Sequence, residues 1–175
     1  SWIPALLEES PPFAVGFLLW ILPTTTLIFG MGFLDRYSWL RSSPQLATAL
    51  QAAGLLMVVT GGIWAAFQTH LGRIMAYGSI VETGLALIAL SLDSRLGVPI
   101  LFLLIPGRAL GLAVWSLALT ILKEHSESEQ FNAMRGLLRT VPVASTGLIL
   151  ASLSTSAFPL LAGFPAGLAL WDGLS

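Results

Sequence analysis

IMAYGSIVETGLALIALSL, residues 74–92, is the clearest indication of the fold, because it is almost wholly apolar and carries one charged side chain, Glu82. A helix needs about 20 mostly apolar residues to cross a bilayer, and this stretch is close to that length. Similar apolar runs lie at approximately 13–34, 46–67, 98–122, 137–157 and 159–173. Together they predict an all-α integral membrane bundle of about six transmembrane helices, in a single transmembrane domain over residues 1–175.

The composition fits a lipid-embedded protein and excludes other classes. Of the 175 residues, 55% are hydrophobic and 10% are charged, and the mean hydropathy is +0.85. An average soluble domain has about 25% charged residues. The net charge of -1 lacks the basic field that nucleic-acid binding needs. Because the chain has no cysteine, it cannot supply disulfides, thiolate metal sites or Cys-ligated iron–sulfur clusters.

The start of the chain and its loops carry little targeting information. The first residue is Ser1, and no basic region precedes an apolar stretch as in a signal peptide, so we expect the chain to begin inside a larger protein or after processing. Lys and Arg are divided almost evenly between alternate loops, which leaves the membrane orientation open. The hydrophilic segment 123–132 is interpreted as an exposed loop or an interfacial helical turn.

Two prolines punctuate the last apolar run. Pro159 and Pro165 lie six residues apart in AFPLLAGFPAG, residues 157–167, with Gly163 between them. A proline frees a backbone carbonyl, which in a membrane must be satisfied by protein or by water in a cavity. The pattern is typical either of a broken helix beside an ion path or of a simple kink.

Two charged residues are expected near the middle of the bilayer. Glu82 lies nine residues into the third run and Arg108 eleven residues into the fourth. A centred acidic group or Arg costs about 2.5–3.5 kcal/mol on insertion scales and usually faces a partner or a wet cavity. A short loop joins the two runs, so their helices are expected to be antiparallel neighbours that bring Glu82 and Arg108 together. The pair could serve proton conduction or form a structural salt bridge, and the sequence leaves both readings open.

His70 and Arg73 are further proton-pathway candidates, at the polar start of the third run. His70 can titrate near neutral pH, although histidines at helix ends are common without such a role. Nothing in the chain resembles a nucleotide-binding glycine loop, paired His metal ligands, a nucleophile elbow or a carboxylate dyad. We therefore expect no catalytic residues, no metal and no cofactor in this chain.

Three stretches resemble one family, the antiporter-like subunits of respiratory complex I and their Mrp antiporter relatives. SWIPALLEESPP, at residues 1–12, is similar to the segment before the family's seventh helix. FQTHLGRIMAYGSIVETGLALIAL, at 67–90, resembles A-Q-T-D-x-K-R-L-L-A-Y-S-S-I-S-H-x-G, with matches at Gln68, Thr69, Arg73, Ala76, Tyr77, Ser79, Ile80 and Gly84. SAFPLLAGFPAGLAL, at 156–170, resembles the start of the family's broken twelfth helix. The resemblance implies that the chain corresponds to helices seven to eleven and the first part of helix twelve.

This resemblance also implies that most of the family's protonatable residues are replaced here. The family's helix-seven lysine aligns with Thr25, the lysine of the second motif with Gly72, and the helix-twelve lysine or glutamate with Gly167. The helix-ten histidine aligns with Pro106, and the histidine of the second motif with Glu82. The fold is expected to be retained. Glu82 and Arg108 either replace the family's protonatable residues locally or form a structural link between two helices.

The expected function follows from the same resemblance. It implies a membrane-arm subunit of a complex-I-like redox-driven pump, contributing to or scaffolding a proton pathway as a non-catalytic subunit of an NAD(P)H or ferredoxin:quinone oxidoreductase. The alternatives are a non-conducting structural subunit, or a subunit of a cation/proton antiporter or a membrane-bound hydrogenase. The implied partners are other membrane subunits and the bilayer, with quinone reached only through partners, in a bacterial plasma membrane, an energy-converting organelle or a thylakoid membrane.

Overall fold

A computed structural model describes residues 10–125, 137–156 and 159–174, and every regular element in these ranges is a helix. The first resemblance segment, with Trp2, Pro4 and Glu9, therefore lies almost wholly outside the described residues, as does most of the hydrophilic segment 123–132. The helices are α2 (Pro12–Arg36), α3 (Ser38–Arg41), α4 (Pro44–Ala66), α5 (Leu71–Ser91), α6 (Ser94–His125), α7 (Leu137–Thr140), α8 (Pro142–Thr155) and α9 (Phe164–Leu174). The all-α fold class is confirmed.

Each predicted apolar run contains a helix, but the helices differ in length. Within the described residues, four helices are long and apolar enough to cross a membrane: α2, α4, α5 and α6. α8 has 14 residues and α9 has 11, which at 1.5 Å per residue gives about 21 and 17 Å, less than the roughly 30 Å of a bilayer core. The prediction of about six transmembrane helices is thus confirmed in part: four helices are long enough to cross, and α8 and α9 are shorter.

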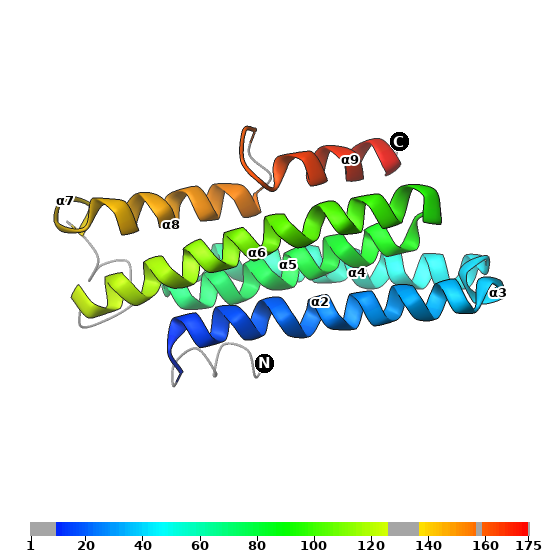
Figure 1. Cartoon of the computed structure of the whole chain (residues 1–175), viewed down its shortest axis with the longest axis horizontal. Coiled ribbons are helices and arrows are strands. Elements are labelled where there is room, and N and C mark those ends of the chain that lie inside the picture. Colours follow the sequence, from blue (N-terminus) through cyan, green and yellow to red (C-terminus); the bar gives the residue numbers. More distant parts are fainter. Residues whose placement is uncertain (1–9, 126–136, 157–158, 175) are drawn as a thin grey trace.

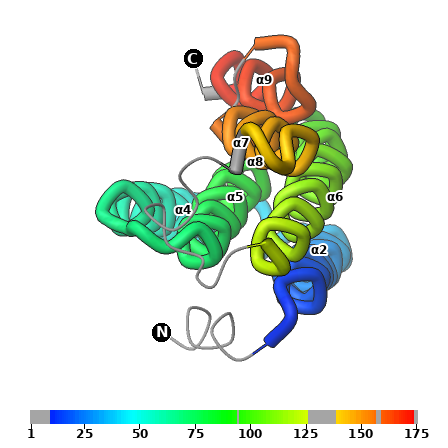
Figure 2. Tube along the Cα trace, turned by 90° about the vertical axis from the view of Figure 1, so that its left-hand side faces the viewer, coloured from blue at the N-terminus to red at the C-terminus, as the bar shows by residue number. Residues whose placement is uncertain are grey.

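The long helices lie side by side along the longest axis of the molecule (Figure 1). α5 packs against α4 on one side and α6 on the other, and α2 packs against α6. α8 and α9 follow one another along the outer side of α6 (Figures 1 and 2). Buried Val15 of α2, Met75 of α5 and Trp115 and Leu119 of α6 share a core cluster. α6 therefore packs against long helices on one side and against α8 and α9 on the other.

Small residues allow α4 and α5 to approach closely. A Cβ atom on Gly84 of α5 would lie 2.6 Å from the carbonyl oxygen of Gly54 of α4, and a Cβ on Gly54 would lie 2.6 Å from that of Gly84. Glycine at this crossing lets the two backbones touch, as is usual for helices that pack within lipid. By contrast, Gly62 and Gly78 have open space around them.

The outer surface of the bundle is apolar. Phe29 of α2, Trp64 of α4 and Trp171 of α9 are 79%, 57% and 74% exposed. α4 contributes little to the core, since its buried residues are Gly54 and Gly61. A surface of this kind is stable against lipid or neighbouring apolar helices, in agreement with a multi-pass integral membrane protein.

Candidate functional site

The structure brings Glu82 and Arg108 together in the interior of the bundle. Glu82 lies in the middle of α5 and Arg108 in the middle of α6, and these helices run antiparallel through the short connection at Leu92 and Asp93. Arg108 Nε lies 3.7 Å from Glu82 Oε2, and the side chains are 6% and 12% exposed. Opposite charges at this distance attract each other strongly where water is scarce.

Backbone carbonyls provide the hydrogen bonds of Arg108. Its Nη2 donates to the carbonyl oxygen of Leu19 in α2 at 3.0 Å and to that of Ser79 in α5 at 3.2 Å. Because Arg108 itself belongs to α6, one side chain links three of the membrane-crossing helices. At 3.7 Å, the contact with Glu82 is longer than a normal hydrogen bond and is an ion pair.

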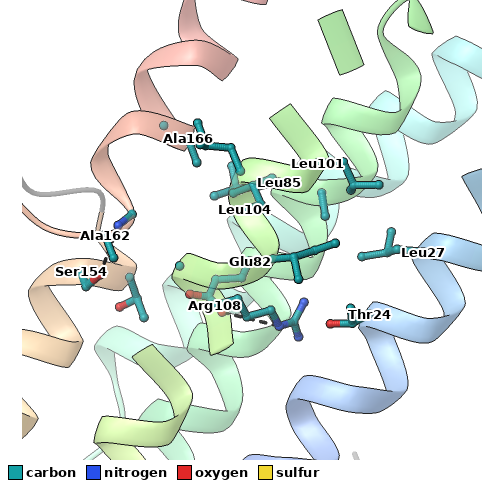
Figure 3. Close-up of a pocket in the computed structure, with 17 residues that line it drawn as sticks. Thr24, Leu27, Glu82, Leu85, Leu101, Leu104, Arg108, Ser154, Ala162 and Ala166 are labelled. Atoms are coloured by element: carbon teal, nitrogen blue, oxygen red, sulfur yellow. Dashed lines mark hydrogen bonds and ion pairs between the residues drawn. The ribbon is translucent and has the colours of Figure 1, made fainter. Parts of the chain in front are cut away.

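A cavity of about 50 Å³ adjoins this ion pair. A buried water needs about 10–15 Å³ of such volume, so the cavity has room for roughly three waters. Its walls come from α2, α5, α6, α8 and the start of α9, and the polar side chains in them are Thr24, Glu82, Arg108, Ser154 and Thr155 (Figure 3). The hydroxyl of Thr24 points toward the Arg108 guanidinium in this view. The cavity therefore brings several polar groups together beside the ion pair.

The segment between α8 and α9 closes one side of the cavity. Residues 159–163 form turns and bends rather than a helix, and Leu160 has a φ of 73°, a conformation that L-residues rarely adopt. The N–H of Gly163 donates to Ser154 Oγ at 3.2 Å, and a Cβ on Gly107 of α6 would lie 3.1 Å from the carbonyl oxygen of Ala162. These contacts hold the turn against α8 and α6.

Of the three residues predicted to break the last helix, two lie in the turn before α9 and one lies in α9. Pro159 lies in the non-helical turn and is exposed, whereas Gly163 lines the cavity. Pro165 is the second residue of α9, a position where its missing N–H costs no helical hydrogen bond. The interruption therefore precedes α9, and Pro165 starts this helix instead of breaking it.

His70 and Arg73 lie apart from the ion pair. His70 directly precedes α5 and Arg73 is in its first turn. Glu82 follows them by twelve and nine residues, or about 18 and 14 Å along a helix. The four proton-pathway candidates thus form one close pair and one separate pair at the end of α5.

Thr24 and Ser154 are cavity residues that sequence reasoning missed. Thr25, the position aligned with the family's helix-seven lysine, is exposed, and its Oγ1 donates to the Ile21 carbonyl at 2.8 Å. The buried neighbour Thr24 faces the cavity instead, on the same side of α2 as buried Leu27. Successive helical residues point about 100° apart, so an alignment shifted by one residue selects the wrong face. The sequence holds no signal for Ser154, whose role depends on the turn that packs against it.

The candidate site has the groups for proton exchange and water binding and lacks those for metal binding. In the described ranges, no group of three or more His, Cys, Asp or Glu side chains could hold a metal ion. Glu82 can accept or release a proton, whereas Arg108 stays charged and can only influence its neighbours. The cavity adds hydroxyl groups and space for water between these residues and the turn.

Comparisons with known proteins identify the family. Residues 1–173 match the family described as NADH:quinone oxidoreductase/Mrp antiporter, TM. The chain is 29% identical to NAD(P)H-quinone oxidoreductase subunit 2 of Synechococcus sp. (strain JA-3-3Ab), over 99% of this chain and 33% of the relative. It is 34% identical to NADH-ubiquinone oxidoreductase chain 5 of Strongylocentrotus purpuratus, over 93% of this chain and 25% of the relative.

Two further likenesses extend the range of relatives. A probable K(+)/H(+) antiporter subunit of Rhizobium meliloti (strain 1021) is 31% identical over 64% of this chain and 11% of its own length. Among solved structures, that of the membrane-bound sulfane sulfur reductase (MBS), an archaeal respiratory membrane complex, matches the fold with a TM-score of 0.88 and 21% identity, over 99% of this chain and 36% of the matched chain.

These findings confirm the resemblance seen in the three sequence motifs. The chain spans about a third of the length of the first of these relatives, and its described residues have the membrane-crossing helices that the family's name implies. The match over residues 1–173 establishes that the chain belongs to the NADH:quinone oxidoreductase/Mrp antiporter transmembrane family.

Proposed function

We propose that this chain is part of a membrane-arm subunit of a redox-driven proton pump, and that it contributes a segment of the proton pathway. Family membership and the names of two relatives, both quinone oxidoreductase subunits, support the assignment to such a complex. The observation that carries the proposal is Glu82, a carboxylate inside the membrane-crossing bundle that lines a cavity together with Arg108 and the hydroxyl side chains of Thr24, Ser154 and Thr155.

In this proposal Glu82 exchanges protons with water in the cavity. A hydronium ion in the cavity gives its proton to the carboxylate, and the carboxylic acid then gives the proton to a second water, which becomes hydronium, so that charge and atoms balance over the cycle. The hydroxyls of Thr24 and Ser154 can donate to or accept from these waters, and Arg108 places a positive charge beside the carboxylate. Burial makes each such interaction stronger than it would be in water.

Partners belong to the same proposal. Because the relatives include subunits of quinone oxidoreductases, we propose that other membrane subunits contact the apolar outer surface and that redox chemistry and quinone binding take place in partners. In this assignment Glu82 responds to events in those subunits through the helices that position it.

A non-conducting, structural role is the second candidate. It is favoured by the two carbonyl hydrogen bonds that hold Arg108 in place and by Thr25, Gly72 and Gly167 at the positions where the resemblance expects protonatable residues. Under this candidate the ion pair joins α5 to α6 and the cavity is a packing defect. A role within a cation/proton antiporter is a third candidate, favoured by the likeness to the Rhizobium protein.

The test uses the full-length subunit in its native complex, reconstituted in vesicles. Proton uptake is measured with a redox donor and, separately, with a K⁺ or Na⁺ gradient as the driving force. We expect redox-driven uptake that falls at least tenfold in Glu82→Gln, because the amide cannot exchange a proton. Glu124→Gln, at an exposed position near the end of α6, is the matched control and should pump normally.

The outcomes separate the candidates. Unchanged redox-driven uptake in Glu82→Gln would contradict the proton-exchange role and leave the structural candidate. A different result is that the unmodified protein takes up protons when a cation gradient is applied and shows no uptake with the redox donor. That result would support the antiporter candidate and overturn the pump assignment.

A further inference from the structure

The carbonyl of Leu19 in α2 lacks its normal helical partner. In an α-helix this carbonyl accepts from the N–H four residues later, and here that residue is Pro23, which has no N–H. Leu19 is 5% exposed and belongs to the core cluster shared by α2, α5 and α6, so lipid and bulk water do not reach it. Within a membrane protein, such a carbonyl requires a donor from a neighbouring element.

Arg108 supplies a donor to this carbonyl. Its Nη2 lies 3.0 Å from the Leu19 oxygen and 3.2 Å from the Ser79 oxygen. The Ser79 carbonyl also accepts from Thr83 Oγ1 at 2.7 Å, in addition to the N–H that a regular helix provides. A carbonyl oxygen has two lone pairs. The Ser79 oxygen can therefore fill both without Arg108, whereas the Leu19 oxygen has no helical N–H donor. Leu19 is therefore the stronger partner of the guanidinium.

Glu82 provides less directional support for Arg108. The Nε–Oε2 distance of 3.7 Å is too long for a hydrogen bond. Within the described chain, Arg108 Nε and Nη1 and Glu82 Oε2 have no hydrogen-bond partner. The orientation of the guanidinium is thus set by backbone carbonyls from α2 and α5, and the carboxylate contributes through charge alone.

We propose that Arg108 replaces the hydrogen bond that Pro23 removes from α2, so that Pro23 and Arg108 act as one unit joining α2, α5 and α6. Pro23 creates the acceptor and Arg108 fills it, which positions the guanidinium beside Glu82 whatever the protonation state of the carboxylate. Arg108 is in this sense a positioning residue. This unit does not depend on proton exchange by Glu82 and would also operate in a non-conducting subunit.

A double-mutant cycle in the full-length subunit within its membrane complex tests this unit. The variants are Pro23→Ala, Arg108→Gln and both together, and the readouts are the yield of assembled complex and its Tm. Arg108→Gln should lower both. Pro23→Ala provides an N–H for Leu19, so in the Arg108→Gln background it should raise Tm and the yield of assembled complex by recovering one hydrogen bond. In the unmodified background it should raise Tm by much less, because the carbonyl is already satisfied.

Two control cycles separate this coupling from general effects. Pro99→Ala changes another proline inside a helix, in α6, and its effect should be the same with Arg108 and with Arg108→Gln. Glu82→Gln should likewise leave the effect of Pro23→Ala unchanged, which distinguishes failure of this proposal from failure of the proton-exchange proposal.

Equal effects of Pro23→Ala in the Arg108 and Arg108→Gln backgrounds would overturn the proposal. If Arg108→Gln does not assemble, recovery of assembly in the double variant supports the proposal. If neither assembles, the same cycle with the milder Arg108→Lys decides, and additivity there counts against it.

Discussion

Thr24 places a hydroxyl beside the buried pair of Glu82 and Arg108 and is one of the polar side chains that line the cavity (Figure 3). Thr24 is 6% exposed, whereas its neighbours Thr25 and Thr26 are exposed and donate to carbonyls of their own helix. Three consecutive threonines thus have two different surroundings. Of the three, Thr24 is the one that lines the cavity with Glu82.

Thr24→Val tests whether the Thr24 hydroxyl contributes to proton transfer to Glu82. Valine keeps the shape of threonine and removes the polar group, so we expect redox-driven proton uptake to slow by about two- to tenfold, the effect of losing one hydrogen bond worth 0.5–1.5 kcal/mol. Thr26→Val, on the same helix with its hydroxyl bonded to the Leu22 carbonyl at 2.8 Å, should pump at the normal rate. Equal rates in both variants and the unmodified complex would exclude Thr24 from the pathway.

At the scale of the elements, close contact between α4 and α5 depends on small residues at one crossing. α4 touches the rest of the described chain almost entirely through α5. The Gly54 and Gly84 backbones meet there, and a Cβ on Gly84 would also lie 2.9 Å from Val58 Cγ2. Because backbone atoms cannot move aside as a flexible side chain can, any larger residue at this crossing must push the helices apart.

Gly84→Ala should therefore destabilise the protein by about 1–3 kcal/mol, the usual cost of overpacking a core. Gly78→Ala is the matched control on α5, because no atom lies within 4 Å of its added Cβ. It should be neutral or slightly stabilising, since alanine favours helix over glycine by about 1 kcal/mol. Thermal denaturation of the assembled complex would measure both, and a Gly84→Ala variant as stable as Gly78→Ala would contradict this account of the crossing.

The whole molecule has its polar connections at opposite ends of the long helices. Asp35 and Arg41, which form an ion pair, line a hollow with Ser42 and Asp93, so the connections from α2 to α4 and from α5 to α6 lie at the same end. Gln68 belongs to the connection from α4 to α5, at the other end of these two helices. The four membrane-crossing helices therefore expose alternate connections to opposite sides of the bilayer.

This topology can be tested by cysteine labelling, because the chain contains no cysteine of its own. In a full-length subunit without other cysteines, Ser42→Cys and Asp93→Cys should react with a membrane-impermeant maleimide from one side of oriented vesicles. Gln68→Cys should react only from the opposite side. Labelling of Gln68→Cys and Ser42→Cys from the same side would show that α4 does not cross the membrane.

The sequence determined the membrane environment, the helices and the depth of the two buried charges. Hydropathy and the bilayer thickness act on local stretches of chain, so the apolar runs located α2, α4, α5 and α6 and placed Glu82 and Arg108 near their centres. The three motifs, read as a resemblance, also identified the family that the comparisons confirmed.

The tertiary structure decided which groups meet. That Arg108 bonds the Leu19 carbonyl, that Thr24 rather than Thr25 faces the cavity, and that the turn before α9 packs on Ser154 all depend on how each helix is rotated and how its neighbours pack. A run of apolar residues on all sides carries no signal for this rotation, because in lipid every face can be apolar. The contacts of a few buried polar groups fix it, and these contacts join residues as far apart as Leu19 and Arg108.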